Sequence, residues 1–149
     1  AILYGFWRSA SFLMLTAGFF DMLDGATARA VRKTTPFGGF LDSVVDRYSD
    51  MAILIAFIIY YAVAADIFMV SLCSITAVGC VLIPYTRAKA ETFISHCNIG
   101  IMERAERILL IAAGCYFNLM QPLFWILAIM THFTVLQRIY YTWKEAQKI

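Results

Sequence analysis

Residues 21–29 read DMLDGATAR, and two further aspartates, Asp42 and Asp46, follow this stretch. The first pair, Asp21 and Asp24, is spaced by three residues and the second pair by four, so each pair shares one face of a helix. Two facing helices of this kind place four carboxylates around one point, where their burial is costly unless they are paired or bind a cation. Oxygen ligands suit hard divalent cations. The spacing therefore predicts a metal site made by these four side chains.

The rest of the chain is strongly apolar. Of its 149 residues, 62% are hydrophobic and 15% are charged, whereas soluble domains average about 25% charged residues. Residues 51–65, 67–86 and 108–137 carry no charge, and a membrane-spanning helix needs about 20 apolar residues. The composition predicts an all-α, polytopic transmembrane helix bundle formed by the single domain 1–149.

Charged and turn-forming residues divide the apolar chain into helices. Asp66 separates two of them, and Pro122 marks the start of another because proline is tolerated in the first helical turn. Turns are expected at residues 34–39 and 96–100. We predict about five spans, at residues 2–29, 39–64, 67–92, 101–119 and 121–143.

Lysine and arginine are concentrated at alternate connections between these spans. The connections near Asp66 and Gln121 contain none. The other connections contain Arg32, Lys33, Arg87, Lys89, Arg104 and Arg107. Since cytoplasmic loops of membrane proteins are enriched in Lys and Arg, we expect an integral cell membrane protein whose basic side, with the aspartates, faces the cytoplasm.

The full pattern D-x2-D-G-x2-A-R-x8-G-x3-D-x3-D, which ends at Asp46, resembles the signature of the CDP-alcohol phosphotransferase family at every fixed position. The resemblance implies a membrane enzyme that transfers a phosphatidyl-type group from a CDP-linked lipid, CDP-diacylglycerol or CDP-archaeol, to a small alcohol and releases CMP. It also implies Mg²⁺ or Mn²⁺ as cofactor, with two ions expected, a homodimer, and no nucleic acid partner. The family usually has six spans, so we expect this chain to lack the first.

Four residues near the first aspartate pair are candidates for binding the CDP moiety. Gly25 and Ala28 are small, which favours either close helix packing or close approach of a ligand, and the resemblance places the matching glycine against CDP. Arg29 is either an interfacial arginine paired with the aspartates or a diphosphate clamp, which suits a guanidinium. The family position that matches Thr35 is also a nucleotide contact. We predict that all four contact the CDP-alcohol.

Asp46 is the candidate catalytic base. It lies one helical turn beyond Asp42, and a carboxylate beside a metal ligand can take the proton of an incoming hydroxyl. The metal would polarise the phosphoryl oxygens. Asp50 continues the same helical row, and we expect it to form a salt bridge within its own helix rather than to act in catalysis.

A second group of charged residues is expected to hold the acceptor. The segments R-x-K-A-E at 87–91 and G-x2-E-R-x-E-R at 100–107 resemble the branch of the family formed by phosphatidylinositol phosphate and archaetidylinositol phosphate synthases. The positive-inside rule accounts for some of these charges, but two or more arginines can also grip a phosphate. We predict that the phosphate of inositol phosphate is bound by Arg87, Lys89, Arg104 and Arg107.

Two alternatives stay open. The same chemistry can use glycerol phosphate, serine or a CDP-inositol-type substrate. A divalent-cation transporter would also carry carboxylates in the membrane, but along a pore, whereas these aspartates gather at one side.

The four cysteines form no C-x2-C pair, so neither zinc nor disulfides are expected. His132 is expected to be packed or hydrogen-bonded between helices.

Overall fold

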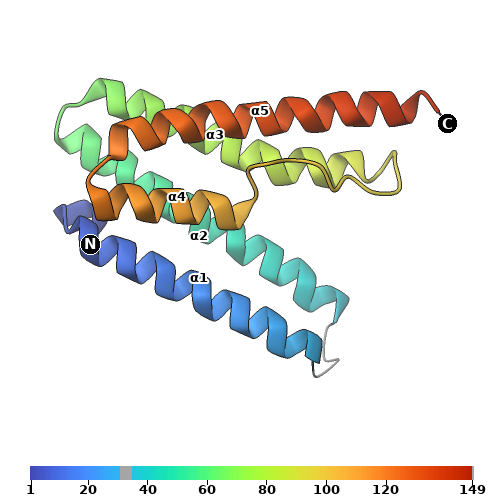
Figure 1. Ribbon diagram of the computed structural model, residues 1–149, viewed down its shortest axis with the longest axis horizontal. Helices are drawn as coiled ribbons and strands as arrows, with labels where there is room; N and C mark the ends of the chain where they lie inside the picture. Colours follow the sequence, from blue (N-terminus) through green and yellow to red (C-terminus); the bar gives the residue numbers. More distant parts are fainter. Residues whose placement is uncertain (31–34, 149) are drawn as a thin grey trace.

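The computed structural model describes residues 1–30 and 35–148, apart from the side chains of Met22 and of residues 24–30. This part of the chain contains a 3-10 turn, η1 (Ile2–Tyr4), and the helices α1 (Trp7–Ala30), α2 (Pro36–Val63), α3 (Ile67–Ala90), α4 (Arg104–Phe117) and α5 (Met120–Ala146). No strand occurs among the described residues, so the expected all-α bundle is confirmed (Figure 1).

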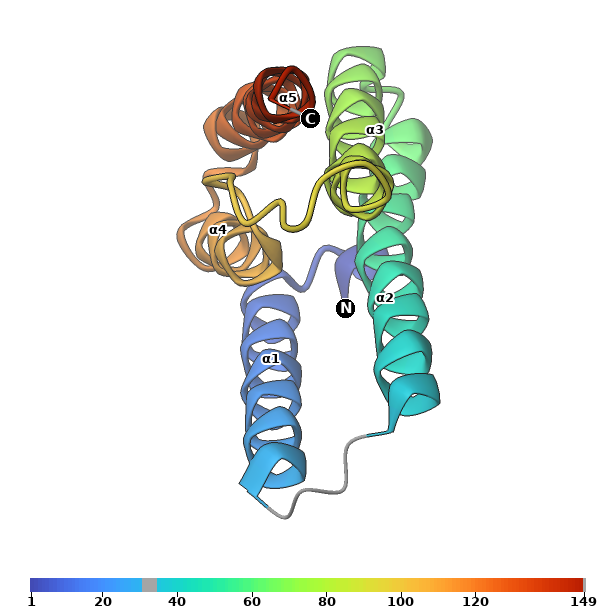
Figure 2. The same ribbon diagram turned by 90° about the vertical axis from the view of Figure 1, so that its right-hand side faces the viewer.

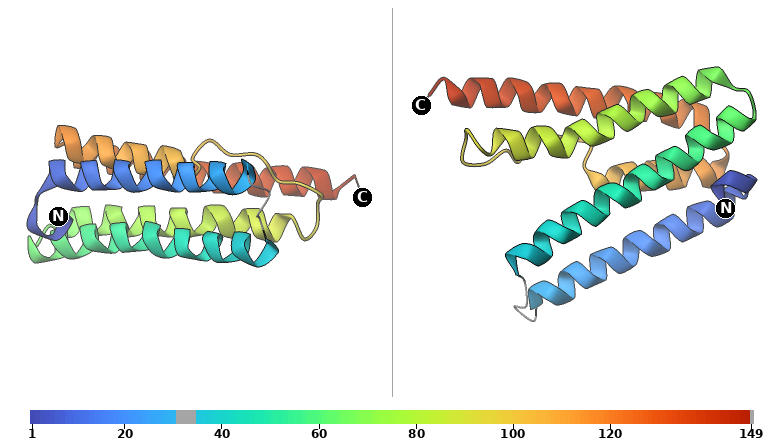
Figure 3. Two further views of the ribbon diagram at one scale, coloured as in Figure 1. Left: turned by 90° about the horizontal axis from the view of Figure 1, so that it is seen from below. Right: turned by 180° about the vertical axis from the view of Figure 1, so that it is seen from behind.

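The start of α4 lies between the two helices that carry the aspartates. α3 packs against α5, α2 packs against α3, and α1 packs against α4. Seen from one end, α1 and α2 stand on opposite sides of the bundle (Figure 2). The view from below places α4 beside α1, and α2 beside α3 (Figure 3, left). Side chains from the beginning of α4 can therefore reach both α1 and α2.

The start of α2 differs from the sequence prediction. The hydroxyl of Thr35 accepts a hydrogen bond from the backbone N–H of Gly38 at 3.0 Å, and Pro36 occupies the first helical position. A threonine cap and a proline in the first turn both favour a helix start. Residues 36–39, predicted as a turn, are therefore the first turn of α2.

The predicted break at Asp66 is confirmed, because its carboxylate caps α3 by accepting from Met69 N–H at 3.0 Å.

The connection between α3 and α4 is longer than predicted, since the fourth helix begins at Arg104 and not at residue 101. Its backbone is bonded to α5: Arg138 Nε donates to the carbonyl of Ile99 at 2.8 Å, and the hydroxyl of Thr134 accepts from Met102 N–H at 3.2 Å. Gly100 has a positive φ of 138° and lies against Thr134, where a Cβ would come within 2.7 Å of Cγ2. These contacts replace the helical bonds that the prediction assumed.

The core joins α1, α2 and α5 through aromatic rings and α3 to α5 through a glycine. The ring of the fully buried Phe57 lies 5.2 Å from that of Phe124 and 6.0 Å from that of Trp7, centroid to centroid. Gly79 of α3 faces Thr131 of α5, and a Cβ on Gly79 would come within 2.7 Å of the Thr131 Cβ. Small residues at such positions let two helix backbones approach closely.

The prediction for His132 agrees with the fold. His132 on α5 places its Nε2 3.1 Å from the carbonyl oxygen of Ile75 on α3, which links the two helices as expected. The four cysteines are free and buried. Cys97 lies in the connection between α3 and α4 and is packed with Ala90 and Ile94.

Among the described helices, α3 and α5 are long and apolar enough to cross a membrane. α1 and α2 have 24 and 28 residues but carry the aspartates and several arginines. α4 has 14 residues, which gives a length of about 21 Å at 1.5 Å per residue, less than the roughly 30 Å of a hydrocarbon core. Large apolar side chains such as Val63 and Ile67 are 84% and 78% exposed, which suits contact with lipid.

Candidate active site

Arg104, the first residue of α4, connects the two aspartate-bearing helices. Its Nη1 lies 3.0 Å from Oδ2 of Asp21 on α1 and 2.8 Å from Oδ1 of Asp46 on α2. Its Nε lies 3.2 Å from Oδ1 of Asp50, one turn further along α2. One guanidinium thus bonds three carboxylates, and charge-assisted hydrogen bonds of this kind are the strong ones.

Arg107 forms a second ion pair with Asp50, one helical turn beyond Arg104. Its Nη2 lies 2.7 Å from Asp50 Oδ2, and the two side chains are 6% and 11% exposed. Asp50 therefore gives one carboxylate oxygen to each arginine. The expectation that Asp50 pairs within its own helix is wrong. Its partners are on α4, and Arg47 instead donates to the carbonyl of Ser43 at 2.8 Å.

The structure brings part of the predicted metal site together. Asp21 and Asp46 converge on one nitrogen of Arg104, and Asp42 lies about one helical turn before Asp46 on α2. Among the described side chains, no three His, Cys, Asp or Glu residues form a group that could hold a metal ion. The side chain of Asp24, the remaining predicted ligand, lies outside the described residues.

The donor chemistry of these carboxylates nevertheless fits a divalent cation. Asp21 and Asp46 come from different helices and already share one positive charge, that of Arg104. The guanidinium stands where a cation bound by both oxygens would be, and it holds those oxygens at hydrogen-bonding distance from its own nitrogen. Carboxylate oxygens are the ligands that Mg²⁺ and Mn²⁺ prefer.

Beside this cluster is a cavity of about 190 Å³ rich in charged groups. It is lined by Asp46, Arg47, Asp50, Ile83, Pro84, Arg87, Glu103, Arg104, Arg107 and Arg138. The five arginines outnumber the three acidic residues, so the cavity suits an anion. Three of the four residues predicted to bind the acceptor phosphate line it together with the predicted base, Asp46.

Arg138 is a cavity residue that the sequence analysis missed. It lies within α5, inside the span predicted at residues 121–143, and its side chain is 2% exposed. It reaches across to α3, where Nη1 donates to the carbonyl of Ile83, and its Nη2 lies 3.9 Å from Glu103. The sequence did contain a signal for Arg138: it directly follows the uncharged residues 108–137. Ionisable residues inside membrane helices are usually functional.

Arg87 and Lys89, both on α3, are directed to different places. Arg87 lines the cavity, and it donates to Glu91 from Nε at 3.1 Å and to the side chain of Asn98 at 2.9 Å. The hydrogen bond from Arg87 lowers the pKa of Glu91. Lys89 is not among the cavity residues, and its Nζ lies 5.4 Å from the centroid of the Phe93 ring.

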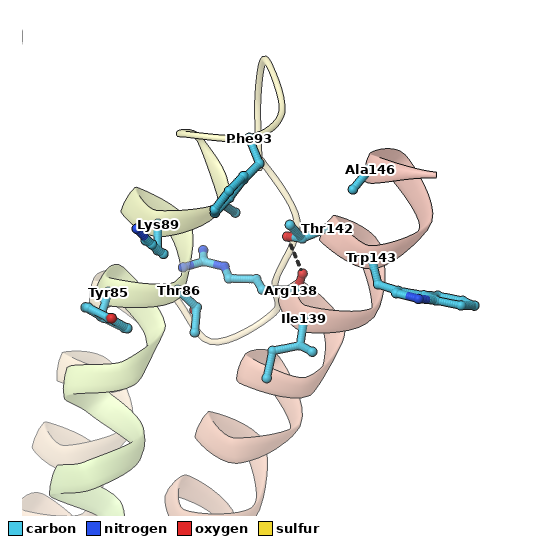
Figure 4. Close-up of a pocket in the computed structure, with 10 residues that line it drawn as sticks. Tyr85, Thr86, Lys89, Phe93, Arg138, Ile139, Thr142, Trp143 and Ala146 are labelled. Atoms are coloured by element: carbon cyan, nitrogen blue, oxygen red, sulfur yellow. Dashed lines mark hydrogen bonds between the residues drawn. The ribbon is translucent and has the colours of Figure 1, made fainter. Parts of the chain in front are cut away.

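Lys89 instead lines a second pocket, of about 320 Å³, between the ends of α3 and α5 (Figure 4). Its walls are mainly aromatic and aliphatic and include Tyr85, Ile139 and Trp143. Figure 4 shows Arg138 extending from α5 toward α3, with Thr142 donating to the Arg138 carbonyl at 2.7 Å. The role predicted for Lys89 at the acceptor phosphate therefore stays a prediction.

The residues predicted to contact the CDP moiety are only partly described. Gly25, Ala28 and Arg29 belong to the last turns of α1, and the side-chain surroundings of these residues lie outside the described part of the chain. Thr35 is exposed and caps α2 through its hydroxyl. Its predicted nucleotide contact also stays a prediction.

The chain resembles known proteins along most of its length. A family model described as CDP-alcohol phosphatidyltransferase matches residues 1–137. The archaetidylinositol phosphate synthase of Methanothermobacter thermautotrophicus is 40% identical over 140 residues, which cover 89% of this chain and 69% of that protein. The archaetidylinositol phosphate synthase of Pyrococcus horikoshii is 38% identical over 140 residues, covering 93% and 70%.

Solved structures agree with these sequence matches. The crystal structure of Mycobacterium tuberculosis phosphatidylinositol phosphate synthase with CDP-DAG bound has a TM-score of 0.87 and 28% identity, and the match covers 95% of this chain and 76% of that one. The same enzyme in complex with manganese and citrate has a TM-score of 0.86, with 95% and 73% covered.

Proposed function

We propose that this chain, which belongs to the CDP-alcohol phosphatidyltransferase family, transfers a phosphatidyl-type group from a CDP-linked lipid to inositol phosphate and releases CMP. The protein is an integral membrane enzyme, as its apolar helices and its relatives indicate. One observation carries the choice of acceptor: the carboxylate of Asp46 lines the same small cavity as five arginines. A proton acceptor and a phosphate-binding surface are thus adjacent. The similarity to archaetidylinositol phosphate synthases supports inositol phosphate in particular.

In this reaction Asp46 takes the proton from the attacking hydroxyl of the acceptor. The hydroxyl oxygen forms a bond to the β-phosphorus of the CDP-lipid while the bond from that phosphorus to the bridging oxygen breaks, and CMP leaves with the bridging oxygen. Positioning and charge neutralisation dominate phosphoryl transfer. The chain's contribution is therefore to hold the two substrates in line and to keep Asp46 free to accept the proton.

The four aspartates Asp21, Asp24, Asp42 and Asp46 would hold Mg²⁺ or Mn²⁺, with two ions proposed. When bound, the metal supplies polarisation of the phosphoryl oxygens. The related enzyme crystallised with manganese supports Mn²⁺ as one suitable ion. The CDP moiety is proposed to lie against Gly25, Ala28, Arg29 and Thr35, as expected from the family pattern.

The acceptor phosphate is proposed to bind Arg87, Arg104, Arg107 and Arg138 in the cavity beside Asp46. Arg107 and Arg138 are almost fully buried there, so a phosphate in contact with them would be largely shielded from water. Glycerol phosphate offers the same phosphate and is the second candidate. Serine offers none, which makes it a poor match for five arginines.

The side of the membrane that the site faces and the oligomeric state are also proposed. The basic residues that flank the cavity favour the cytoplasmic side of the membrane. A homodimer is proposed from the family resemblance. The cation-transporter alternative has no further support, because the chain belongs to a family of transferases.

An acceptor comparison tests the proposed function. The detergent-solubilised protein is given CDP-diacylglycerol or CDP-archaeol labelled in the cytidine, and CMP release is measured with inositol phosphate, glycerol phosphate or serine. We expect release that depends on Mg²⁺ or Mn²⁺ and is fastest with inositol phosphate. Faster release with glycerol phosphate would reassign the acceptor, and preference for serine would exclude the phosphate-binding role of the cavity.

A further inference from the structure

Arg104 belongs to two sites at once. Through Nη1 it neutralises Asp21 and Asp46, which are proposed metal ligands. It also lines the cavity proposed for the acceptor phosphate. We propose that Arg104 couples these sites: it pairs with the aspartates while the metal is absent, and metal binding releases its Nη1 to the acceptor phosphate. The inference rests on the proposed metal and acceptor sites and adds a mechanism of communication between them.

Competition for the same oxygens is the first step. Mg²⁺ needs oxygen ligands at about 2.0–2.1 Å, and Arg104 Nη1 already lies at 3.0 and 2.8 Å from one oxygen each of Asp21 and Asp46. Two cations cannot occupy the space between the same two oxygens. A divalent cation that binds these carboxylates must therefore displace Nη1, and Arg104 must weaken metal binding as long as it stays.

Asp50 can hold Arg104 during this displacement. The Nε atom of Arg104 bonds Asp50, whereas its Nη1 atom contacts Asp21 and Asp46. The Nη1 contacts can break while the contact to Asp50 persists, so the guanidinium turns and does not leave the cavity. Arg104 also has the freedom to turn, because its side chain is 27% exposed whereas that of Arg107 is 6% exposed.

The consequence is reciprocal coupling between metal and phosphate. Without metal, the positive charge of Arg104 is neutralised by aspartates and contributes little to an anion site. With metal bound, the same charge joins Arg87, Arg107 and Arg138. Linkage requires that a phosphate which attracts Arg104 raises the metal affinity by the same factor. The enzyme would thereby favour binding of the acceptor after the metal.

The test measures Mn²⁺ binding and needs neither lipid substrate nor turnover. Free Mn²⁺ is quantified by electron paramagnetic resonance in detergent, with and without methyl phosphate, and a protein-free blank corrects for complexes between the two. For the wild-type protein we expect methyl phosphate to tighten Mn²⁺ binding by about fivefold or more, within the usual range of coupling between sites.

The variant Arg104→Gln decides whether Arg104 carries the coupling. It should bind Mn²⁺ about threefold or more tightly than wild type in the absence of phosphate, and methyl phosphate should no longer change its Mn²⁺ affinity. The matched variant Arg87→Gln removes a cavity arginine that has no contact with Asp21 or Asp46 among the contacts of the described residues. The Arg87→Gln protein should bind methyl phosphate more weakly, but saturating methyl phosphate should still tighten its Mn²⁺ binding.

Several outcomes would overturn the inference. Coupling that persists in Arg104→Gln would mean that phosphate contacts the metal directly, and unchanged or weaker Mn²⁺ binding in that variant would exclude competition. If Arg104→Gln does not fold, Arg104→Lys takes its place: its single ammonium group cannot stay bonded to Asp50 while it turns to the phosphate, so the coupling should weaken, and unchanged coupling would contradict the proposal. Absence of coupling in the wild-type protein would contradict it as well. Failure of the wild-type protein to bind Mn²⁺ would instead refute the proposed metal site, and failure to use inositol phosphate would leave this test unaffected.

Discussion

Asp50 on α2 and Arg107 on α4 form a buried ion pair, with Oδ2 and Nη2 2.7 Å apart although the residues are 57 positions apart in the sequence. The other oxygen of Asp50 bonds Arg104. One carboxylate therefore fixes two arginines of the proposed acceptor site. It also ties α4 to α2, two helices that are not consecutive in the chain.

Loss of the Asp50 carboxylate should destabilise the fold, because it leaves Arg107 charged and buried without its partner. Removing one member of a buried ion pair typically costs about 3–5 kcal/mol. We expect a loss of this order in the free energy of unfolding for Asp50→Ala, measured by denaturation in detergent. Lys148→Gln is the control, because it removes an exposed ion pair to Glu145, which should change stability by less than about 1 kcal/mol. Equal effects of the two variants would contradict this account of Asp50.

The proposed metal site predicts a strict dependence of turnover on Asp21. Asp21→Ala should abolish CMP release, since it removes a carboxylate oxygen from the proposed metal site. Chelation with EDTA should do the same to the wild-type protein, and added Mg²⁺ or Mn²⁺ should restore the activity. A folded Asp21→Ala variant with near-normal turnover would show that the metal assignment is wrong. Asp24→Ala tests the fourth proposed ligand in the same assay.

Asp46→Asn should separate binding from chemistry. The amide keeps the size of the side chain but cannot accept the hydroxyl proton, and a general base contributes roughly 10²–10⁴-fold to a rate. We expect the rate of transfer to fall by that factor while the CDP-lipid still binds, measured by equilibrium binding of the labelled nucleotide lipid. A loss of less than about tenfold would argue that the bound metal alone activates the acceptor.

Gly79 should be intolerant of any side chain because α3 and α5 meet there. A Cβ at this position would clash with Thr131, and overpacking of a tight contact costs roughly 1–3 kcal/mol. Gly79→Ala should lower the thermal unfolding temperature in detergent. Gly39→Ala is the matched control, because a Cβ at Gly39 meets nothing within 4 Å and alanine is the better helix former by about 1 kcal/mol. A neutral Gly79→Ala would contradict the close approach of the two helices.

The sequence predicted the helices well because the signals that define them are local. Long apolar runs mark α3 and α5, and Asp66 caps α3 within one turn of its own position. The start of α4 was misplaced for the opposite reason. Residues 99 and 102 bond to Arg138 and Thr134 of α5, and sequence spacing does not reveal bonds to a helix more than 30 positions away.

The candidate site was likewise predicted where its residues are close in the sequence and missed where its contacts join distant helices. Helical spacing was enough to group Asp42 with Asp46 and Arg104 with Arg107, because each pair lies on one helix. It could not show that Arg104 stands between Asp21 and Asp46, or that Arg138 reaches the cavity from α5. Those relationships depend on how α1, α2, α4 and α5 pack. Asp50 was assigned to its own helix because only partners on that helix could be judged from spacing.

Arg107→Gln should affect the acceptor far more than the CDP-lipid. The guanidinium lines the cavity beside Asp46, and a hydrogen bond to a charged group contributes about 1.5–3 kcal/mol. We expect the apparent KM for inositol phosphate to rise by about tenfold or more, measured by acceptor titration at saturating CDP-lipid. Lys144→Gln is the control, since Lys144 also lies on the basic side, in the last turn of α5, but does not line the cavity. If both variants raise the KM equally, the effect comes from the general positive charge of this side of the protein. If Arg107→Gln weakens the CDP-lipid and the acceptor alike, the cavity holds the diphosphate and not the acceptor phosphate.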